Sequence, residues 1–397
     1  MEKSVNTNNI WNSITTNYFA TRCNKNSTYF INTITIAPNK VLVCYSRYSY
    51  IDTYYLYAQI LTVSNNNNIK LTTPPIQLNS HCSYYVKAVS ISTNKILVCY
   101  RNRDDGHLYI QKLMVSNDDT IMTSAPIQCN TDDCYHITMA QLTPNKILLC
   151  YSNYNDNYYR NCQFHTQLLT IDEDDNIMIS DPIKYDQYGI IYTKILKISN
   201  GRALMIYNKR NGNNSLYTYD LCAEILEIRD DVIIRSPIQY SNMNSLHIET
   251  ILSSNKVLTF YKDHNDRYLY VQMFTITDDN VDLRLIKCGN YKCGDYKSTY
   301  TAATFIASNV VLVCYCNQSD NNIHVRCCNQ SDNNIYAQII TISDDDIQKI
   351  CAPVKMNYYK SHNISITPVS SDKVLMCYSN ISEDYNLYAQ IITEDMT

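Results

Sequence analysis

The phrase NKILVCY (residues 94–100) recurs along this 397-residue chain, and its recurrence decides the fold. Close copies are NKVLVCY (39–45) and NKILLCY (145–151). Successive tyrosines of the phrase are 51 to 63 residues apart, and the longest interval contains a tandem duplication, residues 316–327 and 328–339. A sequence period near 50 residues is typical of propellers and solenoids. Weaker copies of the phrase end at Tyr207, Tyr261, Tyr315 and Tyr378.

Each repeat carries the pattern of four short strands. In the first repeat, an alternating stretch (29–36) precedes the β-branched run VLVCY (41–45), and LYAQILTV (56–63) follows after a loop. A fourth strand is expected after an Asn/Asp-rich turn, as in NNNNIKLTTPPIQ (65–77). Runs of this kind bounded by turn residues are typical of strands, and no segment has the capped apolar period of a helix. The sequence therefore predicts an all-β, seven-bladed β-propeller with four antiparallel strands per blade.

The two ends of the chain predict how the ring closes. The last repeat stops after NLYAQIITEDMT (386–397) and lacks its fourth strand, whereas NTNNIWNSITTN (6–17) resembles one. We therefore expect the N-terminal strand, within residues 1–23, to complete the last blade in a three-plus-one arrangement that leaves no open edge. The chain is predicted to be a single domain, 1–397, with repeats at about 24–79, 80–130, 131–186, 187–241, 242–290, 291–357 and 358–397.

Composition argues against several classes of protein. Lys and Arg number 33 against 37 Asp and Glu, for a net charge of −4, and no basic stretch suggests a nucleic-acid partner. No apolar run approaches the roughly 20 residues of a membrane span, and residues 1–17 lack the apolar core of a signal peptide. The 17 cysteines have no zinc-type spacing, so they are interpreted as small buried residues in a reducing compartment. These features predict a cytoplasmic or virion-associated protein.

The start of each innermost strand supplies the candidate ligand-binding residues. Counting back 15 residues from each repeat tyrosine gives mostly aromatic side chains, and two histidines lie one residue off that register. Because the innermost strands of a propeller line its channel, we expect these side chains to ring one mouth, where they could bind a sugar or another small ligand. The alternative is that they pack between blades. The candidates are Phe30, Tyr85, His136, Tyr192, His247, Tyr300 and His362, and, just beyond them, Asn32, Lys87, Lys194 and Glu249.

No catalytic motif, metal site or cofactor is indicated. Asp runs such as DEDDN (172–176) lack the Gly of a calcium loop and lie where a tight hairpin is expected. The densest acid–base cluster, residues 263–266, occurs in one repeat only. The Gln of the LYAQ phrase is expected to make a hydrogen bond within its own blade. The Lys of the Asn-Lys turn is expected to keep a solvated ammonium.

The phrases NKVLVCY, LYAQILT and PIQ extend over nearly the whole chain. In this respect the chain resembles seven-bladed β-propeller repeat proteins of unassigned function, of the type found in AT-rich bacteria and large DNA viruses. It lacks the Gly-His and Trp-Asp pair of WD40 repeats, the double Gly of kelch repeats and the Asp box of sialidases. The resemblance implies the propeller fold and carries over no functional residue.

Three functions remain open from the sequence. The leading hypothesis is a non-catalytic interaction or structural scaffold module that presents the variable loops between second and third strands to a protein partner, for instance as a virion component. The first alternative is a lectin-like glycan-binding propeller that uses the aromatic and histidine mouth. The second alternative is a hydrolase or lyase with its site at the channel mouth. No oligomeric state is indicated.

Overall fold

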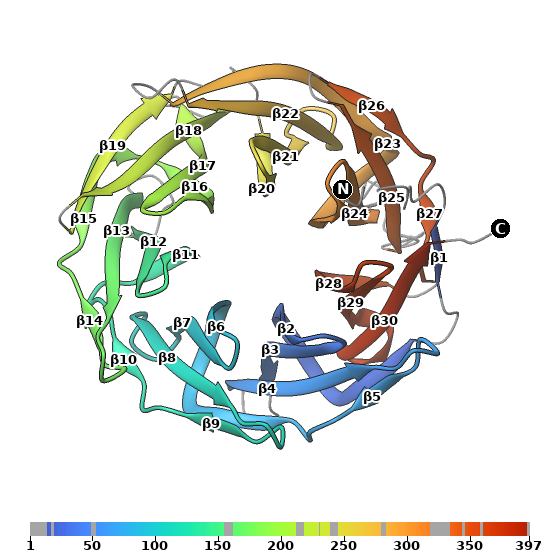
Figure 1. Cartoon of the computed structure of the whole chain (residues 1–397), viewed down its shortest axis with the longest axis horizontal. Coiled ribbons are helices and arrows are strands. Elements are labelled where there is room, and N and C mark those ends of the chain that lie inside the picture. Colours follow the sequence, from blue (N-terminus) through green and yellow to red (C-terminus); the bar gives the residue numbers. More distant parts are fainter. Residues whose placement is uncertain are drawn as a thin grey trace, which may run out of the picture.

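The structure is a computed structural model. It describes residues 14–16, 20–48, 53–154, 162–211, 218–229, 231–238, 245–278, 283–317, 334–343, 346–357 and 360–394. Within these ranges the chain is all-β, the paired strands are antiparallel, and the only helix is a single 3-10 turn, η1 (Ile381–Glu383). The strands are arranged around an open centre in a propeller-like fold (Figure 1).

The strands fall into sets by their place in the repeat, and the first set lies nearest the centre (Figure 1). The first strands are β2 (Thr21–Ala37), β6 (Ile76–Ser92), β11 (Cys134–Thr143), β16 (Ile190–Ser199), β20 (Ser245–Ser253), β23 (Leu283–Ala307) and β28 (Ser361–Ser370). The second strands are β3 (Lys40–Tyr48), β7 (Lys95–Asn102), β12 (Lys146–Tyr154), β17 (Arg202–Asn211), β21 (Lys256–Asp263), β24 (Val310–Asn317) and β29 (Lys373–Asn380).

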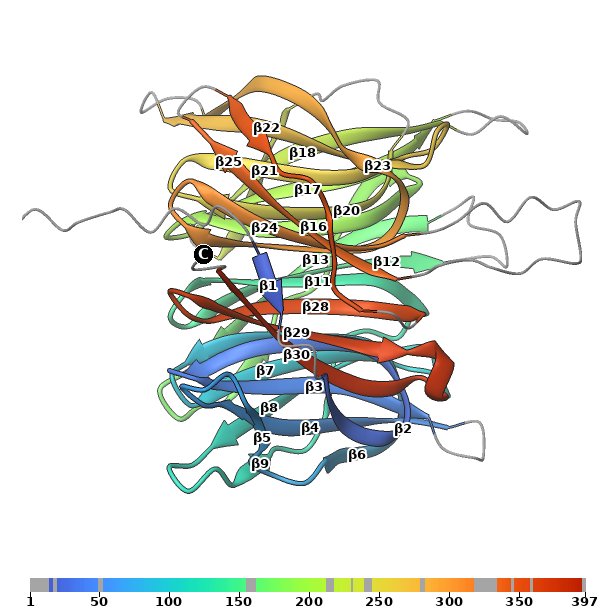
Figure 2. The same ribbon diagram turned by 90° about the vertical axis from the view of Figure 1, so that its right-hand side faces the viewer.

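Two further sets of strands lie farther from the centre than the first two (Figure 1). Figure 2 shows the same strands from the side. The third strands are β4 (Tyr54–Val63), β8 (Leu108–Val115), β13 (Cys162–Ile171), β18 (Thr218–Arg229), β22 (Tyr268–Asp278), β25 (Ile335–Ile342) and β30 (Asn386–Glu394). The outer strands are β1 (Ile14–Thr16), β5 (Ile69–Leu71), β9 (Ile121–Thr123), β10 (Ile127–Gln128), β14 (Ile177–Ile179), β15 (Ile183–Tyr188), β19 (Val232–Ile238), β26 (Ile347–Ile350) and β27 (Val354–Lys355).

Three long strands connect neighbouring repeats. The first part of β6 pairs with β4, and its second part pairs with β7; β23 bridges β22 and β24 in the same way. The first part of β2 pairs with β30, with Thr21 opposite Ala389. The short strand β1 also pairs with β30, with Ile14 opposite Glu394. Segments from the two ends of the chain therefore lie side by side in one sheet.

Each second strand is buried on both faces, which explains its β-branched sequence. Residues 41–45 of β3 are 0% exposed. Leu42 packs with Val98 of the following repeat, whereas Val43 packs with Leu375 of the last repeat. Full burial of such a side chain stabilises the fold by about 1.5–3 kcal/mol. The first and last repeats thus share a hydrophobic core.

The lysine of the repeated Asn-Lys turn contacts the next repeat. Lys40 Nζ lies 2.6 Å from Asp119 Oδ1, in the turn before β9. Lys95 pairs with Asp175, in the turn before β14. Lys373, in the last repeat, donates to the carbonyl of Asn65 in the first repeat at 2.9 Å. The expected solvated ammonium is therefore wrong for these residues, because the side chain reaches over the neighbouring hairpin.

The recurrent Gln of the third strand contacts two repeats. Gln111 Nε2 donates to the carbonyl of Ser124 in its own repeat at 2.8 Å and to that of Leu78 in the preceding repeat at 2.9 Å. Gln167 does the same with Ser180 and Cys129. A hydrogen bond within the repeat was expected, and the bond to the preceding repeat adds a link between neighbours.

The structure describes the side chains of thirteen cysteines, and none of these thirteen forms a disulfide. Eleven are buried, and only Cys222 and Cys351 are half-buried. The expectation that they act as small buried apolar residues is confirmed for those eleven. Among the described residues, no helix has the length and apolarity needed to cross a membrane.

Candidate functional site

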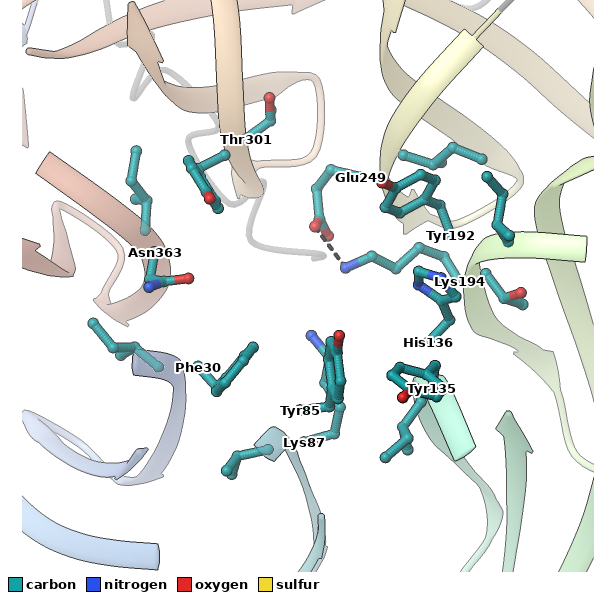
Figure 3. Close-up of a pocket in the computed structure, with 18 of the residues that line it drawn as sticks. Phe30, Tyr85, Lys87, Tyr135, His136, Tyr192, Lys194, Glu249, Thr301 and Asn363 are labelled. Carbon is teal, nitrogen blue, oxygen red and sulfur yellow. Dashed lines mark hydrogen bonds and ion pairs between the residues drawn. The ribbon is translucent and has the colours of Figure 1, made fainter. Parts of the chain in front are cut away.

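A cavity of about 780 Å³ lies at the centre of the fold. Its wall is formed mainly by residues of the inner strands, and residues near the ends of β17, β18 and β21 complete it (Figure 3). The volume falls within the range of about 300–1,000 Å³ that is usual for small-molecule sites. The predicted residues that line it are Phe30, Tyr85, Lys87, His136, Tyr192, Lys194, Glu249, Tyr300 and His362.

The aromatic residues of the cavity share an unusual backbone conformation. Tyr85 has a φ of 54° and His136 a φ of 50°, in the left-handed region. Non-Gly residues rarely adopt this region, and bulky side chains do so least of all, at a cost of about 1–2 kcal/mol per residue. The same conformation recurs at the matching position of other inner strands, with φ between 48° and 53° at Phe30, Tyr192, Tyr300 and Asn363.

A β-bulge causes this conformation. In β6, Tyr84 lies opposite Arg101 and Lys87 lies opposite Cys99, so two residues oppose the single Tyr100. A residue inserted in this way bends the strand and redirects a side chain. Corresponding register shifts occur in the other inner strands. The bulge therefore turns one side chain per strand into the cavity, 15 residues before the repeat tyrosine.

The two histidines off this register have separate explanations. In β20 the shift lies between Leu246 and Ile248, which places His247 at the bulge. This strand lacks the second shift that the other inner strands have near their hairpin, so its spacing is one residue shorter. The side chain of His247 lies outside the described part of the structure. In β28 the bulge residue is Asn363, and His362 precedes it while still lining the cavity.

Aromatic rings form a chain of contacts along the wall. The ring centroids of Phe30 and Tyr85 are 5.0 Å apart, and those of His136 and Tyr192 are 4.9 Å apart. Tyr300 and His362 are closer, at 3.9 Å. Offset or edge-on rings at such distances attract one another. The rings therefore pack against one another along the wall, and Figure 3 shows the labelled ones around the cavity.

A second position on each inner strand lies opposite the residue before the repeat tyrosine. Lys87 and Lys194 occupy it in β6 and β16, and Glu249 occupies it in β20. Lys194 Nζ lies 2.6 Å from Glu249 Oε2. Figure 3 shows the side chains of all three extending toward the middle of the cavity. Asn32 holds the position in β2, but its amide oxygen accepts from Ala88 N at 3.1 Å and it does not line the cavity.

The charges in the cavity do not cancel. Within the described residues, the Lys87 ammonium has no ion-pair partner, whereas Lys194 and Glu249 neutralise each other. The neighbouring Lys194 ammonium, together with burial, lowers the pKa of Lys87 to about 8, and the Glu249 carboxylate acts in the opposite direction. The three central side chains therefore present one net positive charge when Lys87 is protonated.

Burial perturbs two further groups in the wall. It lowers the pKa of His362 to about 4, so this imidazole is neutral at pH 7. It raises the pKa of Tyr300 to about 12, and this hydroxyl therefore stays protonated. Both side chains are uncharged at pH 7 and suit contact with a ligand's apolar faces or hydroxyl groups.

Sequence patterns did not identify three cavity residues from outside the inner strands. Arg210 is the last residue but one of β17, Tyr219 is the second residue of β18, and His264 follows β21. The rings of Tyr219 and His264 are 5.9 Å apart. These positions belong to the variable loops, where no repeat phrase marks them. Asn363 and the residues beside the bulge, such as Tyr29 and Tyr135, were also missed, although the 15-residue spacing does mark Asn363.

Other candidate chemistries lack a matching arrangement in the described ranges. The carboxylate of Asp263 accepts from the backbone amide of Asn265 at 2.7 Å, and Asp266 accepts from the Tyr270 hydroxyl at 2.7 Å, so both shape the turn. Within these ranges, no three His, Cys, Asp or Glu side chains come together as a metal site would require.

Comparison with known proteins defines the fold and nothing finer. No protein-family model and no curated protein matches the chain. A Dyadobacter fermentans protein of unknown function is similar in structure, with a TM-score of 0.53 and 11% identity over 97% of this chain and 99% of that one. An oligogalacturonate lyase in complex with manganese has a TM-score of 0.54 and 8% identity, covering 96% and 97%. A putative 6-phosphogluconolactonase from Bacteroides fragilis has a TM-score of 0.50 and 11% identity, covering 82% and 84%. At such identities the likeness supports a propeller-like fold only.

Proposed function

We propose that the repeats form a closed ring of seven blades, with the N-terminal segment as the outer strand of the last blade. The pairing of β1 with β30 and the core shared by the first and last repeats support this proposal. Thr15 lies opposite Thr393, so a disulfide between cysteines placed there would tie the two ends together. The double variant should melt at a higher temperature when oxidised than when reduced, and Thr15→Cys alone should show no such difference. Equal melting temperatures for the two forms of the double variant would argue against the closure.

We propose that the protein is a lectin-like module that binds a carbohydrate in its central cavity. The carrying observation is the set of aromatic residues held in left-handed backbone at one bulge per inner strand, with their side chains at the cavity. Strained conformations of this kind persist where the surrounding structure enforces them, and they cluster at ligand sites. Aromatic faces are suited to stacking on the apolar faces of sugar rings.

Binding is better supported than hydrolysis. General acid–base cleavage of a glycoside uses two carboxyl groups flanking the bond. Among the described residues that line the cavity, Glu249 is the only carboxylate, and Lys194 holds it in an ion pair. The hydrolase or lyase alternative therefore has less support than the lectin-like one. The scaffold hypothesis remains a prediction, because much of the loop face, including residues 155–161 and 318–333, lies outside the described residues.

The test is a glycan array followed by calorimetry on aromatic variants. Phe30, Tyr85 and Tyr192 should each be changed to Asn, because Asn tolerates left-handed backbone and occurs at the same position as Asn363. Each change should weaken glycan binding about fivefold or more, since one stacked ring contributes roughly 0.5–1.5 kcal/mol beyond its buried area. Tyr109→Asn, outside the cavity, is the matched control and should leave binding unchanged. Binding that survives all three variants would exclude the cavity, and absence of any glycan ligand would exclude the lectin-like function.

A further inference from the structure

In the described part of the chain, the ammonium of Lys87 in the cavity has no ion-pair partner of its own. Lys87 is half-buried on β6, and within the described residues no carboxylate lies in ion-pair range of its ammonium. A buried charge without a partner is costly, so proteins normally pair it. The nearby carboxylate, Glu249, is already engaged by Lys194 at 2.6 Å. A lysine in this setting lacks the counter-ion that structural stability alone would favour.

We propose that the cavity selects a sugar bearing one anionic group, and that Lys87 is the residue that binds this group. This inference rests on the lectin-like function proposed above and specifies its ligand. The anion supplies the missing counter-ion of Lys87, while the bulge aromatics contact the sugar ring. An ammonium-to-anion hydrogen bond is stronger than a neutral one, and more so where water is excluded.

The arrangement of charges favours a single anionic group over two. Lys194 and Glu249 lie at the same strand position as Lys87, in β16 and β20. Their ion pair fixes both side chains beside the Lys87 ammonium and adds no net charge. A second anionic group would have to displace Glu249 from Lys194, with repulsion between like charges. The net charge of these three side chains therefore matches one anionic group beside Lys87, while Arg210 adds a further cation in the cavity wall.

Binding of an anion should be coupled to proton uptake. The pKa of Lys87 is lowered to about 8 because Lys194 repels its charged form and burial disfavours it. An anion beside the ammonium has the opposite effect and raises this pKa. At pH 8 the complex should therefore take up as much as about half a proton per ligand. The other titratable or charged groups that act on Lys87 or line the cavity are Lys194, Glu249, Cys99, Arg210, His136, His264, His362 and the tyrosines Tyr29, Tyr85, Tyr135, Tyr192, Tyr219 and Tyr300.

The experiment compares glucuronate with glucose, two sugars of matched ring structure, by calorimetry at pH 8 in two buffers of different ionisation enthalpy. Glucuronate should bind about tenfold or more tightly than glucose, with net proton uptake. Lys87→Met should abolish both the preference for glucuronate and the proton uptake. Lys87→Arg should keep the preference but lose the uptake, because arginine does not titrate near pH 8. Lys70→Met, on the exposed strand β5, is the control and should behave like the wild type.

The possible outcomes distinguish the role of Lys87 in anion binding from the lectin-like function on which that role rests. Equal affinity for the two sugars, or a preference that survives Lys87→Met, would overturn the role of Lys87 and leave the lectin-like function standing.

If neither sugar binds, competitive acetylation of Lys87 across pH, with and without sodium formate, tests the anion site alone. A formate-dependent rise in the pKa of Lys87 would support the anion site, and an unchanged pKa would overturn it. Glucose 6-phosphate in the same calorimetric series should bind more weakly than glucuronate, and tighter binding would overturn the selectivity for a monoanion.

Discussion

Lys40, at the start of β3, forms a 2.6 Å ion pair with Asp119, which lies in the hairpin before β9 of the next repeat. Asp119 has a φ of 67°, and the equivalent Asp175 has a φ of 66°. The same left-handed turn therefore presents a carboxylate to the preceding repeat. Lys146 and Asp231 make the next such pair, also at 2.6 Å. These ion pairs link consecutive repeats on the face formed by the hairpins between first and second strands.

A double-mutant cycle on Lys40→Met and Asp119→Asn tests whether the ion pair between these two residues stabilises the folded protein. Partly exposed ion pairs usually contribute about 0.2–1 kcal/mol, and salt weakens them. We expect a coupling free energy in that range, measured by urea unfolding and reduced in 1 M NaCl. Arg202 and Glu227, which pair within one repeat at 3.5 Å, provide the comparison cycle. Strictly additive single variants would show that the Lys40 contact does not stabilise the fold.

Glu224 replaces the recurrent Gln in β18, and the structure compensates its charge. Glu224 is 0% exposed, and Arg235 of β19 donates to both of its oxygens at 2.8 and 2.9 Å. Arg235→Met would leave a buried carboxylate without its cation, which typically costs about 3–5 kcal/mol. Adding Glu224→Gln should recover most of that loss. Chemical denaturation measures both, and a double variant no more stable than Arg235→Met would contradict the compensation.

Stability should fall in mild acid because of His362. Its pKa is lowered to about 4 by burial, compared with 6.5 when exposed. Between these two values the unfolded chain binds more protons than the folded one, so stability decreases as pH falls from 6.5 to 4. His362→Phe keeps a ring beside Tyr300 and removes the titration. The melting temperature of the variant should decline less over this range than that of the wild type. Parallel curves would show that protonation of His362 does not contribute.

The buried cysteines should resist alkylation until the protein unfolds. Burial raises the pKa of Cys23 and of Cys44 to about 12, so at pH 8 almost no thiolate is present. Iodoacetamide should label these residues only in denaturant, as resolved by peptide mass spectrometry. The half-buried Cys222, with a pKa raised to about 11, should react sooner. Rapid native labelling of Cys44 would indicate that the strands of the first repeat open frequently.

Much of the fold and part of the cavity could be predicted from the sequence because both depend on local period. The phrase ending at Tyr100 predicts a buried strand, and the fixed hairpin geometry places Tyr85 opposite it at a constant spacing. The spacing failed where the hairpin differed. In β20 the absence of a second register shift moved the bulge to His247, whereas in β28 the spacing holds and marks Asn363, which is not aromatic.

The features of the fold and cavity that could not be predicted depend on contacts between repeats, and the sequence pattern within one repeat does not specify such contacts. The turn lysine appears solvated within one repeat, and its partner Asp119 belongs to the next. Arg210, near the end of β17, and His264, just after β21, also line the cavity. The sequences around these two residues differ from one repeat to the next, so no repeated phrase marks them. The two charges at Lys194 and Glu249 were identified as cavity residues, but their pairing required the distance between two strands 55 residues apart.

The bulge affects which amino-acid substitutions could change the ligand preference of this protein. The repeat tyrosine opposite each bulge is buried in the scaffold, whereas the bulge residue itself contributes its side chain mainly to the cavity. Substitution at such a position alters the lining and leaves the buried repeat tyrosine in place, although Phe30 and Tyr85 also contact the edges of two hydrophobic clusters. The present occupants already include phenylalanine, tyrosine, histidine and asparagine, one per inner strand. Selection, or a combinatorial library confined to these positions, could therefore vary ligand preference one repeat at a time on an unchanged framework.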